Sequence, residues 1–530
     1  MQFKTCLALL CCALLSACDT SPPDHDEADI LISGGLVFDG SGDAPVLADV
    51  AISDGHIVFI GDAGAAGLHA AQTVDVSGRW VTPGFIDMHS HAELDLDYGR
   101  DAAPYLRQGI TTVVLGADGD GEPDIDAQLS AWEQQGIGVN GLLYVGHGAV
   151  RSAVMGRAAR EPTADEAQAM KLLVRQGMEG GAFGLSTGLF YVPGTFASTE
   201  EVIELAQVAA EFPGAIYDTH DRDLGAAYQS VGYDASVLEG IRIGEESGTR
   251  VIFSHYNLQG AHNYGRGDVA AQLINDARER GVDVWAAHHP YTATQSSLRS
   301  YTIPAWAAAG GDDAMLERFD DAEQNEKIVR STYDMLEIRG GAEKILLVDE
   351  RPDLNGKTLA QYALENEVAV HEAVQKILRV GNAKVMNLDL YDHDNTRRLA
   401  TEPWMMTCTD GRTPRPDQPI AHPRTFGAFP MKFRLFVQEE EVLDAATAIR
   451  SFSGLAADFL RLPDRGYVRE GYVADLAVID PVRYRDLATY ADPQLQAQGV
   501  EQLFVGGRFA IRDEQLTGEL AGAALRRPTP

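Results

Sequence analysis

The sequence is poor in cysteine and in positive charge. Its 530 residues include five cysteines, and three of them, Cys6, Cys11 and Cys12, lie in one N-terminal apolar segment. A disulfide framework is therefore not expected. The 43 basic side chains are outnumbered by 78 acidic ones, which gives a formal net charge of −35. A surface of this charge repels phosphates, so nucleic acid is not an expected partner.

The N-terminal apolar run is too short to form a stable membrane span. "LALLCCALLSA", residues 7–17, follows a short basic start, whereas a spanning helix needs roughly 20 residues. The pattern predicts an export signal. "LSAC", residues 15–18, resembles the cleavage box of bacterial lipoproteins. This resemblance implies removal of residues 1–17 and a lipid on Cys18, and a plain signal peptide is the alternative.

The segment after the signal is polar and contains proline. Residues 18–28 are the predicted tether, and "TSPPDHDEAD", residues 20–29, has a composition typical of a flexible linker. Removal of the signal would leave Cys18 and Cys408 as the cysteines of the mature chain. The sequence thus predicts an exported lipoprotein that is membrane-anchored and faces the periplasm or the cell exterior.

Both ends of the remaining chain show the sequence pattern of β-hairpins. Short apolar runs broken by Gly and Asp fill residues 29–82, and similar runs return at 466–481 and 500–513. Such alternation is typical of strands joined by tight turns. We therefore expect residues 29–82 and 451–515 to form one small β-sandwich domain.

The middle of the chain alternates short apolar strands with amphipathic helical segments, such as 198–212, where Ser198 and Glu201 predict a capping box. Eight βα repeats predict an α/β fold with a (β/α)8 TIM-type barrel over residues 83–450. Residues 292–400 are too long for a loop, so we expect an insertion before the last strand that could cover the site. The eight strands are predicted at residues 84–91, 111–118, 141–148, 182–189, 215–220, 250–255, 282–291 and 404–411.

Histidines gather at the ends of these strands, where a barrel places its chemistry. His89 and His91 alternate on one strand and so point to the same side. A lone histidine at a strand end is more often structural, but imidazoles and carboxylates that converge from several strands suit zinc or a similar divalent metal. The polar residues at the strand ends are His89, His91, Asp118, His147, His220, His255, His288, His289 and Asp410.

Longer motifs resemble the amidohydrolase superfamily. "DVSGRWVTPGFIDMHSH", residues 75–91, is similar to the first barrel strand of that superfamily, which carries a His-x-His metal pair. The resemblance narrows to the N-acyl-D-amino-acid deacylase (D-aminoacylase) family through "GAFGLSTGLFYVPGTFAS" (181–198), "SHYNLQGAHNYG" (254–265) and "HPRTFGAFP" (422–430).

The resemblance implies a metal-dependent hydrolase of linear amides that deacylates N-acyl-D-amino acids or related N-acyl compounds. One or two divalent ions are implied, with zinc as the expected metal. Metal-bound hydroxide would attack the amide, and Asp410 would act as general base and then as acid toward the leaving amine. The implied metal ligands are His89, His91, Asp118, His220, His255 and Asp410.

The same resemblance predicts substrate contacts, although arginines in such positions are often structural ion pairs. Tyr191 and His147 are weaker candidates, for which packing in the core is the alternative. The predicted substrate-binding residues are Arg222, Tyr291, Ser297, Arg424, Tyr191 and His147.

Three positions depart from the patterns of this superfamily. A carboxylated lysine bridge is not expected, because Lys171 is the only lysine between Lys4 and Lys327 and lies in a helical segment. Asp118 stands where typical D-aminoacylases carry a bridging cysteine, and a carboxylate suits zinc as well as harder metals. Asn257 replaces a lysine that helps to hold the substrate carboxylate, so a neutral or modified substrate is also considered.

Two other functions stay open at this point. Cyclic amide hydrolases and deaminases share the same barrel, and a fold does not determine a reaction. A non-catalytic surface-binding lipoprotein would require a missing ligand or acid, whereas the four histidine ligands and Asp410 are present.

Overall fold

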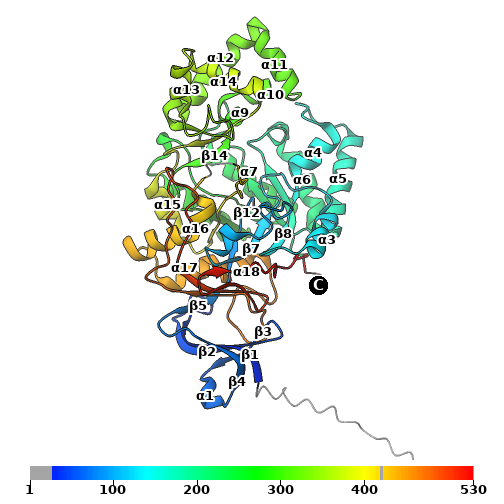
Figure 1. Ribbon diagram of the computed structural model, residues 1–530. Helices are drawn as coiled ribbons and strands as arrows, with labels where there is room; N and C mark the ends of the chain where they lie inside the picture. Colours follow the sequence, from blue (N-terminus) through cyan, green and yellow to red (C-terminus); the bar gives the residue numbers. More distant parts are fainter. Residues whose placement is uncertain (1–26, 418–421, 529–530) are drawn as a thin grey trace, which may run out of the picture.

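The computed structural model describes residues 27–417 and 422–528. The predicted export signal, Cys18 and most of the predicted tether lie outside the described residues. Within these ranges, no helix is both long and apolar enough to cross a membrane. Figure 1 shows a β domain in blue at one end, the barrel in the middle and the insertion in green at the other end.

The barrel strands occur where the sequence predicts them. They run parallel in two arcs, β6–β7–β8 and β9–β10–β11–β12–β13–β17. Backbone hydrogen bonds from Met88 N to Thr407 O (3.3 Å) and from Asp410 N to His89 O (2.9 Å) join the first strand to the last. The predicted barrel is thereby confirmed. Its strands are β6 (Phe85–Asp87), β7 (Ile110–Leu115), β8 (Asn140–Leu143), β9 (Val145–Gly146), β10 (Gly184–Gly188), β11 (Ile216–His220), β12 (Arg250–Phe253), β13 (Val284–His288) and β17 (Met405–Thr407).

Amphipathic helices surround the strands. In α6, Val202, Leu205, Ala206 and Ala209 recur at helical spacing and are all buried, as expected for a helix with one apolar face. The helices are α2 (Ala103–Leu106), α3 (Ile125–Gln135), α4 (His147–Met155), α5 (Ala164–Glu179), α6 (Thr199–Ala210), α7 (Tyr233–Ser247), α8 (Gly267–Glu279), α15 (His393–Ala400), α16 (Arg424–Phe433), α17 (Ala445–Phe452) and α18 (Gly454–Leu460).

The two chain ends form one nine-stranded sheet. β5 pairs antiparallel with β18, with Val81 opposite Val478, which joins the two halves as predicted. The C-terminal half begins later than expected, because residues 454–460 form α18, whose Phe459 packs in the barrel core. The strands are β1 (Glu27–Val37), β2 (Val46–Ser53), β3 (His56–Gly61), β4 (His69–Asp75), β5 (Trp80–Pro83), β18 (Leu476–Ile479), β19 (Val500–Val505), β20 (Arg508–Arg512) and β21 (Gln515–Leu516).

The insertion has a hydrophobic core of its own, which includes Leu298, Ile328, Leu347 and Val374. It therefore packs as a separate subdomain rather than as a loop. Its sheet has the order β14–β16–β15. The elements are β14 (Thr294–Ser297), β15 (Ile345–Val348), β16 (Lys384–Asn387), α9 (Leu298–Thr302), α10 (Ala305–Ala308), α11 (Asp312–Asp320), α12 (Ala322–Ile338), α13 (Leu359–Glu365) and α14 (Val370–Val380).

Candidate metal centre and active site

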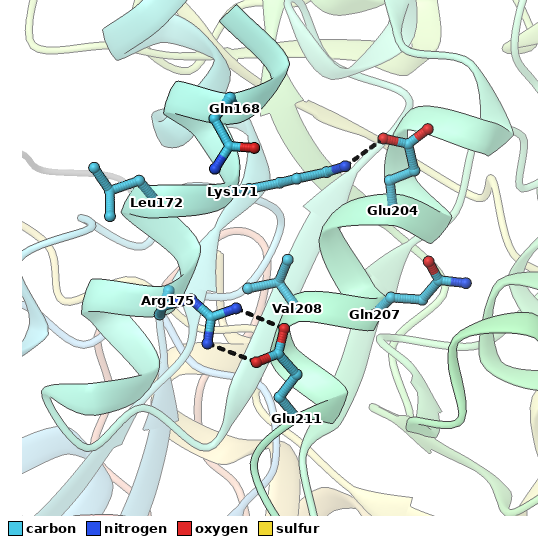
Figure 2. Close-up of a pocket in the computed structure, with 8 residues that line it drawn as sticks. All are labelled: Gln168, Lys171, Leu172, Arg175, Glu204, Gln207, Val208 and Glu211. Carbon is cyan, nitrogen blue, oxygen red and sulfur yellow. Dashed lines mark hydrogen bonds and ion pairs between the residues drawn. The ribbon is translucent and has the colours of Figure 1, made fainter. Parts of the chain in front are cut away.

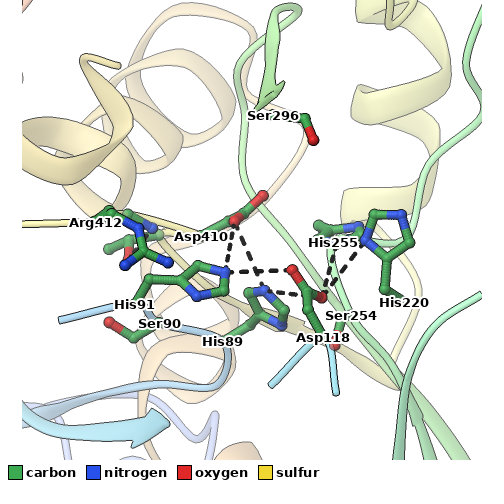
Figure 3. Close-up of polar contacts among 12 residues, drawn as sticks. His89, Ser90, His91, Asp118, His220, Ser254, His255, Ser296, Asp410 and Arg412 are labelled. Atoms are coloured by element: carbon green, nitrogen blue, oxygen red, sulfur yellow. Dashed lines mark hydrogen bonds and ion pairs between the residues drawn. The ribbon is translucent and has the colours of Figure 1, made fainter. Parts of the chain in front are cut away.

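The predicted metal ligands meet at the C-terminal ends of the barrel strands. They surround Asp118, whose Oδ1 lies 3.6 Å from His89 Nε2, 3.5 Å from His220 Nδ1 and 3.5 Å from His255 Nε2. Its Oδ2 lies 3.3 Å from His91 Nε2. Figure 3 shows the four rings directed at this carboxylate. The structure thus brings together side chains that are far apart in sequence.

Two sets of ligand atoms lie close enough to hold a cation. His89, His91 and Asp410 form one set, and His89, Asp118 and His255 form the other; within each set the atoms lie within 4.8 Å of one another. The two oxygens of Asp118 face different histidines. Asp118 is therefore placed to bridge two ions.

The buried ligand atoms fit a divalent metal. In the described part of the chain, three atoms that face the centre have no hydrogen-bond partner: His89 Nε2, Asp118 Oδ1 and His220 Nδ1. Buried polar atoms without a partner are costly and call for an explanation such as a bound ion. Imidazole nitrogens with carboxylate oxygens form a donor set that suits zinc and similar cations.

The charges of the site also favour a cation. Burial lowers the pKa of His89 to about 3, which leaves its ring neutral and able to bind a metal. Burial acts to raise the pKa of Asp118, but its interactions with the His89 and His220 rings hold that pKa well below 3.8. Burial opposes the charged form of His255, but its contact with Asp118 at 3.5 Å and the charge of Asp410 raise its pKa to about 9. A bound metal would displace that proton.

Three residues of the site have a left-handed backbone. Asp118, His255 and Asp410 have φ values of 56°, 36° and 48°, a region that residues other than glycine rarely adopt. Each residue lies just after a barrel strand. Unusual backbone geometry of this kind is concentrated at functional sites in proteins.

Asp410 links the metal ligands to a buried cation. Its Oδ1 lies 3.6 Å from both His89 Nε2 and His91 Nε2. Its Oδ2 lies 2.6 Å from Arg424 Nη1, which is also 3.3 Å from His289 Nε2. One oxygen thus faces the metal site while the other is fixed by Arg424. The sequence analysis places His289 among the strand-end residues but assigns it no role.

Two further buried carboxylates support the ligands. Asp87 accepts hydrogen bonds from Thr409 N (2.8 Å) and Thr409 Oγ1 (2.5 Å), and burial raises its pKa to about 7. Asp218 accepts a hydrogen bond from Ser254 Oγ (2.5 Å), and burial raises its pKa to about 8. These bonds connect the ends of neighbouring strands, and the sequence reasoning had missed them.

The metal centre opens into a cavity of about 770 Å³. The barrel side contributes metal ligands and Asp120. The insertion contributes the opposite wall. Cavity-lining residues from the insertion include Ser296, Ser297, Tyr301, Met335 and Lys384.

Four of the predicted substrate-binding residues line this cavity: Tyr191, Arg222, Ser297 and Arg424. The Tyr191 ring lies 4.6 Å from the His220 ring. Arg222 bonds to Glu239 (2.8 Å) and to the carbonyl oxygens of Thr195 (3.2 Å) and Ala197 (3.0 Å). Its donors are therefore divided between Glu239 and the loop that follows Tyr191.

Two predicted substrate contacts do not reach the cavity. His147 is fully buried, and its Nε2 lies 2.9 Å from Glu201 Oε1, which also pairs with Arg151. Glu201 is therefore directed at His147, while Ser198 alone caps α6. Tyr291 is 3% exposed, and its hydroxyl donates to Pro423 O at 3.3 Å. Both side chains are taken up by packing, which corrects the prediction.

The structure also places Lys171 and Asn257, the other two residues that bear on the departures from the superfamily pattern. Lys171 lies on the outside of the barrel, where it pairs with Glu204 at 2.7 Å beside the Arg175–Glu211 pair, as Figure 2 shows. It cannot bridge metals at the barrel mouth. Asn257 is 2% exposed and donates to Thr396 Oγ1 at 2.7 Å, so it does not line the cavity.

The barrel, its metal-binding mouth and the β domain define a class of protein. The chain matches the model of the amidohydrolase family over residues 72–511. It is 31% identical to D-aminoacylase of Alcaligenes xylosoxydans xylosoxydans, over 96% of this chain and 99% of that protein. N-acyl-D-glutamate deacylase of the same organism is 30% identical, over 95% and 97%. The chain belongs to the amidohydrolase family.

Solved structures show which members of the family the chain is most usefully compared with. A crystal structure of D-aminoacylase has a TM-score of 0.80 and 31% identity, and the match covers 94% of this chain and 100% of that one. N-acyl-D-glutamate deacylase from Bordetella bronchiseptica, complexed with zinc and a phosphonate inhibitor, has a TM-score of 0.80 and 28% identity, with the same coverage. Within the family, these relatives are N-acyl-D-amino-acid deacylases.

Proposed function

We propose that the protein is a zinc-dependent amide hydrolase that deacylates N-acyl-D-amino acids or related N-acyl compounds. The observation that carries the proposal is the convergence of four histidines, Asp118 and Asp410 at the open end of the barrel. The similarity to D-aminoacylase and N-acyl-D-glutamate deacylase over nearly the whole chain supports this substrate class.

The residues of the site divide the work of hydrolysis. A divalent ion held by the histidines, Asp118 and Asp410 would polarise the amide carbonyl and acidify a water molecule. Asp410 Oδ1 faces the metal ligands, so it can accept the proton of the attacking water and deliver it to the leaving nitrogen. Arg424 holds the other oxygen of Asp410 and thereby fixes its orientation. Tyr191 and Ser297 add hydrogen-bonding groups to the cavity wall.

Amine release from paired N-acetyl-D- and N-acetyl-L-amino acids tests this proposal. We expect the zinc-loaded protein to release amine from the D series, to lose activity with a chelator and to regain it with zinc. Product formation only from cyclic ureides or nucleobases would point to a cyclic amide hydrolase or a deaminase. Binding without turnover of any amide would point to a non-catalytic binding protein.

We also propose that the enzyme is an exported bacterial lipoprotein anchored through Cys18. The "LSAC" pattern after an apolar run and the polar segment that follows it support this proposal. Labelled palmitate should enter the full chain but not a Cys18→Ser variant, and the unaltered chain should fractionate with membranes. Equal labelling of both chains, or none, would contradict the anchor.

A further inference from the structure

The cavity is rich in cations although the chain as a whole is strongly acidic. Against a formal net charge of −35, one lysine and five arginines line this cavity. A local excess of one charge sign in a cleft concentrates ligands of the opposite sign. The cations are Arg157, Arg222, Arg299, Lys384, Arg412 and Arg424.

Five of these cations have an acidic partner. Arg157 and Arg299 share Asp312, and Arg222 pairs with Glu239. The remaining two pairs are Arg412 with Glu93 at 2.6 Å and Arg424 with Asp410 at 2.6 Å.

Lys384 is the exception. Among the residues that the structure describes, it has no ion pair and no hydrogen-bonded partner for its ammonium group. An exposed lysine on an outer surface needs no partner, but this one faces the substrate cavity. Its charge is therefore available to a ligand.

The position of Lys384 places it at one wall of the cavity. It begins β16 and lies opposite Ser297 of β14 in the insertion sheet. Partial burial and then the charge of Arg412 lower the pKa of Lys384, while the more weakly acting charges of Glu93 and Asp349 raise it, so Lys384 lies within electrostatic range of Arg412. Figure 3 shows Arg412 beside His91, with Ser296 of the insertion on the far side of the site. Lys384 from the insertion and Arg412 from the barrel line the same cavity.

We propose that Lys384 and Arg412 form a subsite for a second negative charge on the substrate. This inference rests on the proposed function and refines it. The substrate would be an N-acyl amino acid with an extra carboxylate, carried either by the amino-acid side chain or by the far end of the acyl chain. Arg412 uses one nitrogen for Glu93 and has further N–H groups to share, while Asn382 and Ser300 add polar groups to the same cavity.

Matched substrates separate the two sources of the charge. N-acetyl-D-glutamate against N-acetyl-D-glutamine tests the side chain, and N-succinyl-D-alanine against N-butyryl-D-alanine tests the acyl chain. For one of these pairs we expect about a tenfold preference in kcat/KM for the charged member, expressed mainly in KM and weakened by salt.

Variants at Lys384 show whether the preference depends on this side chain. Lys384→Met should remove the preference and leave the neutral substrates within about twofold, whereas Lys384→Arg should retain it. Lys344→Met is the matched control, because Lys344 belongs to the same insertion but pairs with Asp389 at 2.7 Å outside the cavity. An equal loss on charged and neutral substrates, or no loss on either, would overturn the subsite.

A binding measurement keeps this test independent of turnover. We expect calorimetry on the zinc-loaded protein to show glutarate binding about tenfold more tightly than butyrate, and Lys384→Met to abolish the difference. Such binding without any amide hydrolysis would support the subsite and contradict the proposed function. Hydrolysis with no effect of Lys384 on either measurement would support the enzyme and overturn the subsite.

Discussion

The two walls of the cavity differ in how their side chains are held. On the barrel wall, Asp118 and Asp410 are each contacted by several buried groups, and their backbone positions are fixed by parallel strands. On the insertion wall, Ser297 is half-buried and Lys384 is exposed, and both lie on a small three-stranded sheet. Catalysis tolerates little displacement of the reacting groups, so we expect the rigid barrel wall to carry out the hydrolysis. The insertion wall carries the proposed subsite, so we expect it to select among substrates.

The sharpest test of this contrast is Asp410→Asn. The amide retains the shape of the side chain but cannot accept a proton, so we expect kcat to fall by about 1000-fold with little change in fold. Amine release and circular dichroism measure the two effects. Asp313→Asn on the insertion, an exposed aspartate, is the control, and similar losses in both variants would remove the distinction between the walls.

Asp118→Ala probes the same wall through metal content. Because Asp118 contacts all four histidines, we expect loss of at least one bound ion per chain and about a 100-fold fall in activity. Elemental analysis of the purified variant gives the stoichiometry. Asp120→Ala is the matched control, since Asp120 lines the same cavity but forms no recorded ion pair within the described chain. Unchanged metal and activity in Asp118→Ala would reduce Asp118 to a turn residue.

Lys432 is a buried charged residue of the barrel that does not line the cavity, so its effect on stability can be separated from the function of the cavity. It is fully buried, donates to Thr407 Oγ1 at 2.7 Å, and desolvation lowers its pKa to about 7. The unfolded chain, with an ordinary lysine pKa, binds more protons than the folded chain between pH 7 and 10, so this group makes stability rise with pH there.

We therefore expect Lys432→Met to stabilise the protein most below pH 7, by up to a few kcal/mol, and to lose that advantage as pH rises toward 10. Denaturant unfolding of both chains at several pH values measures the difference. A difference in unfolding free energy that stays constant across this pH range would show that folding does not lower the pKa of Lys432.

The smallest expected effect concerns Arg339, which contacts both the insertion and the barrel and so marks the seam between the two walls. Arg339 is 2% exposed, lies 3.9 Å from the Tyr301 ring and donates to Ala226 O at 3.2 Å. Arg339→Met should cost about 1–2 kcal/mol of unfolding free energy and raise KM more than it lowers kcat. Melting curves and steady-state kinetics test this, with the exposed Arg330→Met in α12, the helix that ends just before Arg339, as control. An unchanged KM would mean that the insertion wall does not depend on this seam.

Much of the barrel could be predicted because its signals are local. Apolar runs of strand length ending in His89, His220 or His255 identify both the fold and the edge where ligands meet. The prediction for the β domain is wrong at residues 454–460, which form α18, because this short helix lies beside strand-rich sequence.

The errors arose where distant partners decide a side chain's environment. His147 resembles a strand-end ligand in sequence, but Glu201 and Arg151 bury it. Lys384 carried no signal in the sequence, because its place in the cavity depends on the register of β14 with β16 and on the docking of the insertion. Such packing cannot be read from local patterns.

The left-handed backbone at Asp118, His255 and Asp410 also bears on engineering this protein for heat resistance. Each such residue costs the fold about 1 kcal/mol or more, which the rest of the molecule must offset. Glycine at these positions would relieve the backbone, but it would remove the groups on which the proposed activity depends. Stabilising substitutions are better sought in the β domain or on the exposed helices, where durability and turnover are not in conflict.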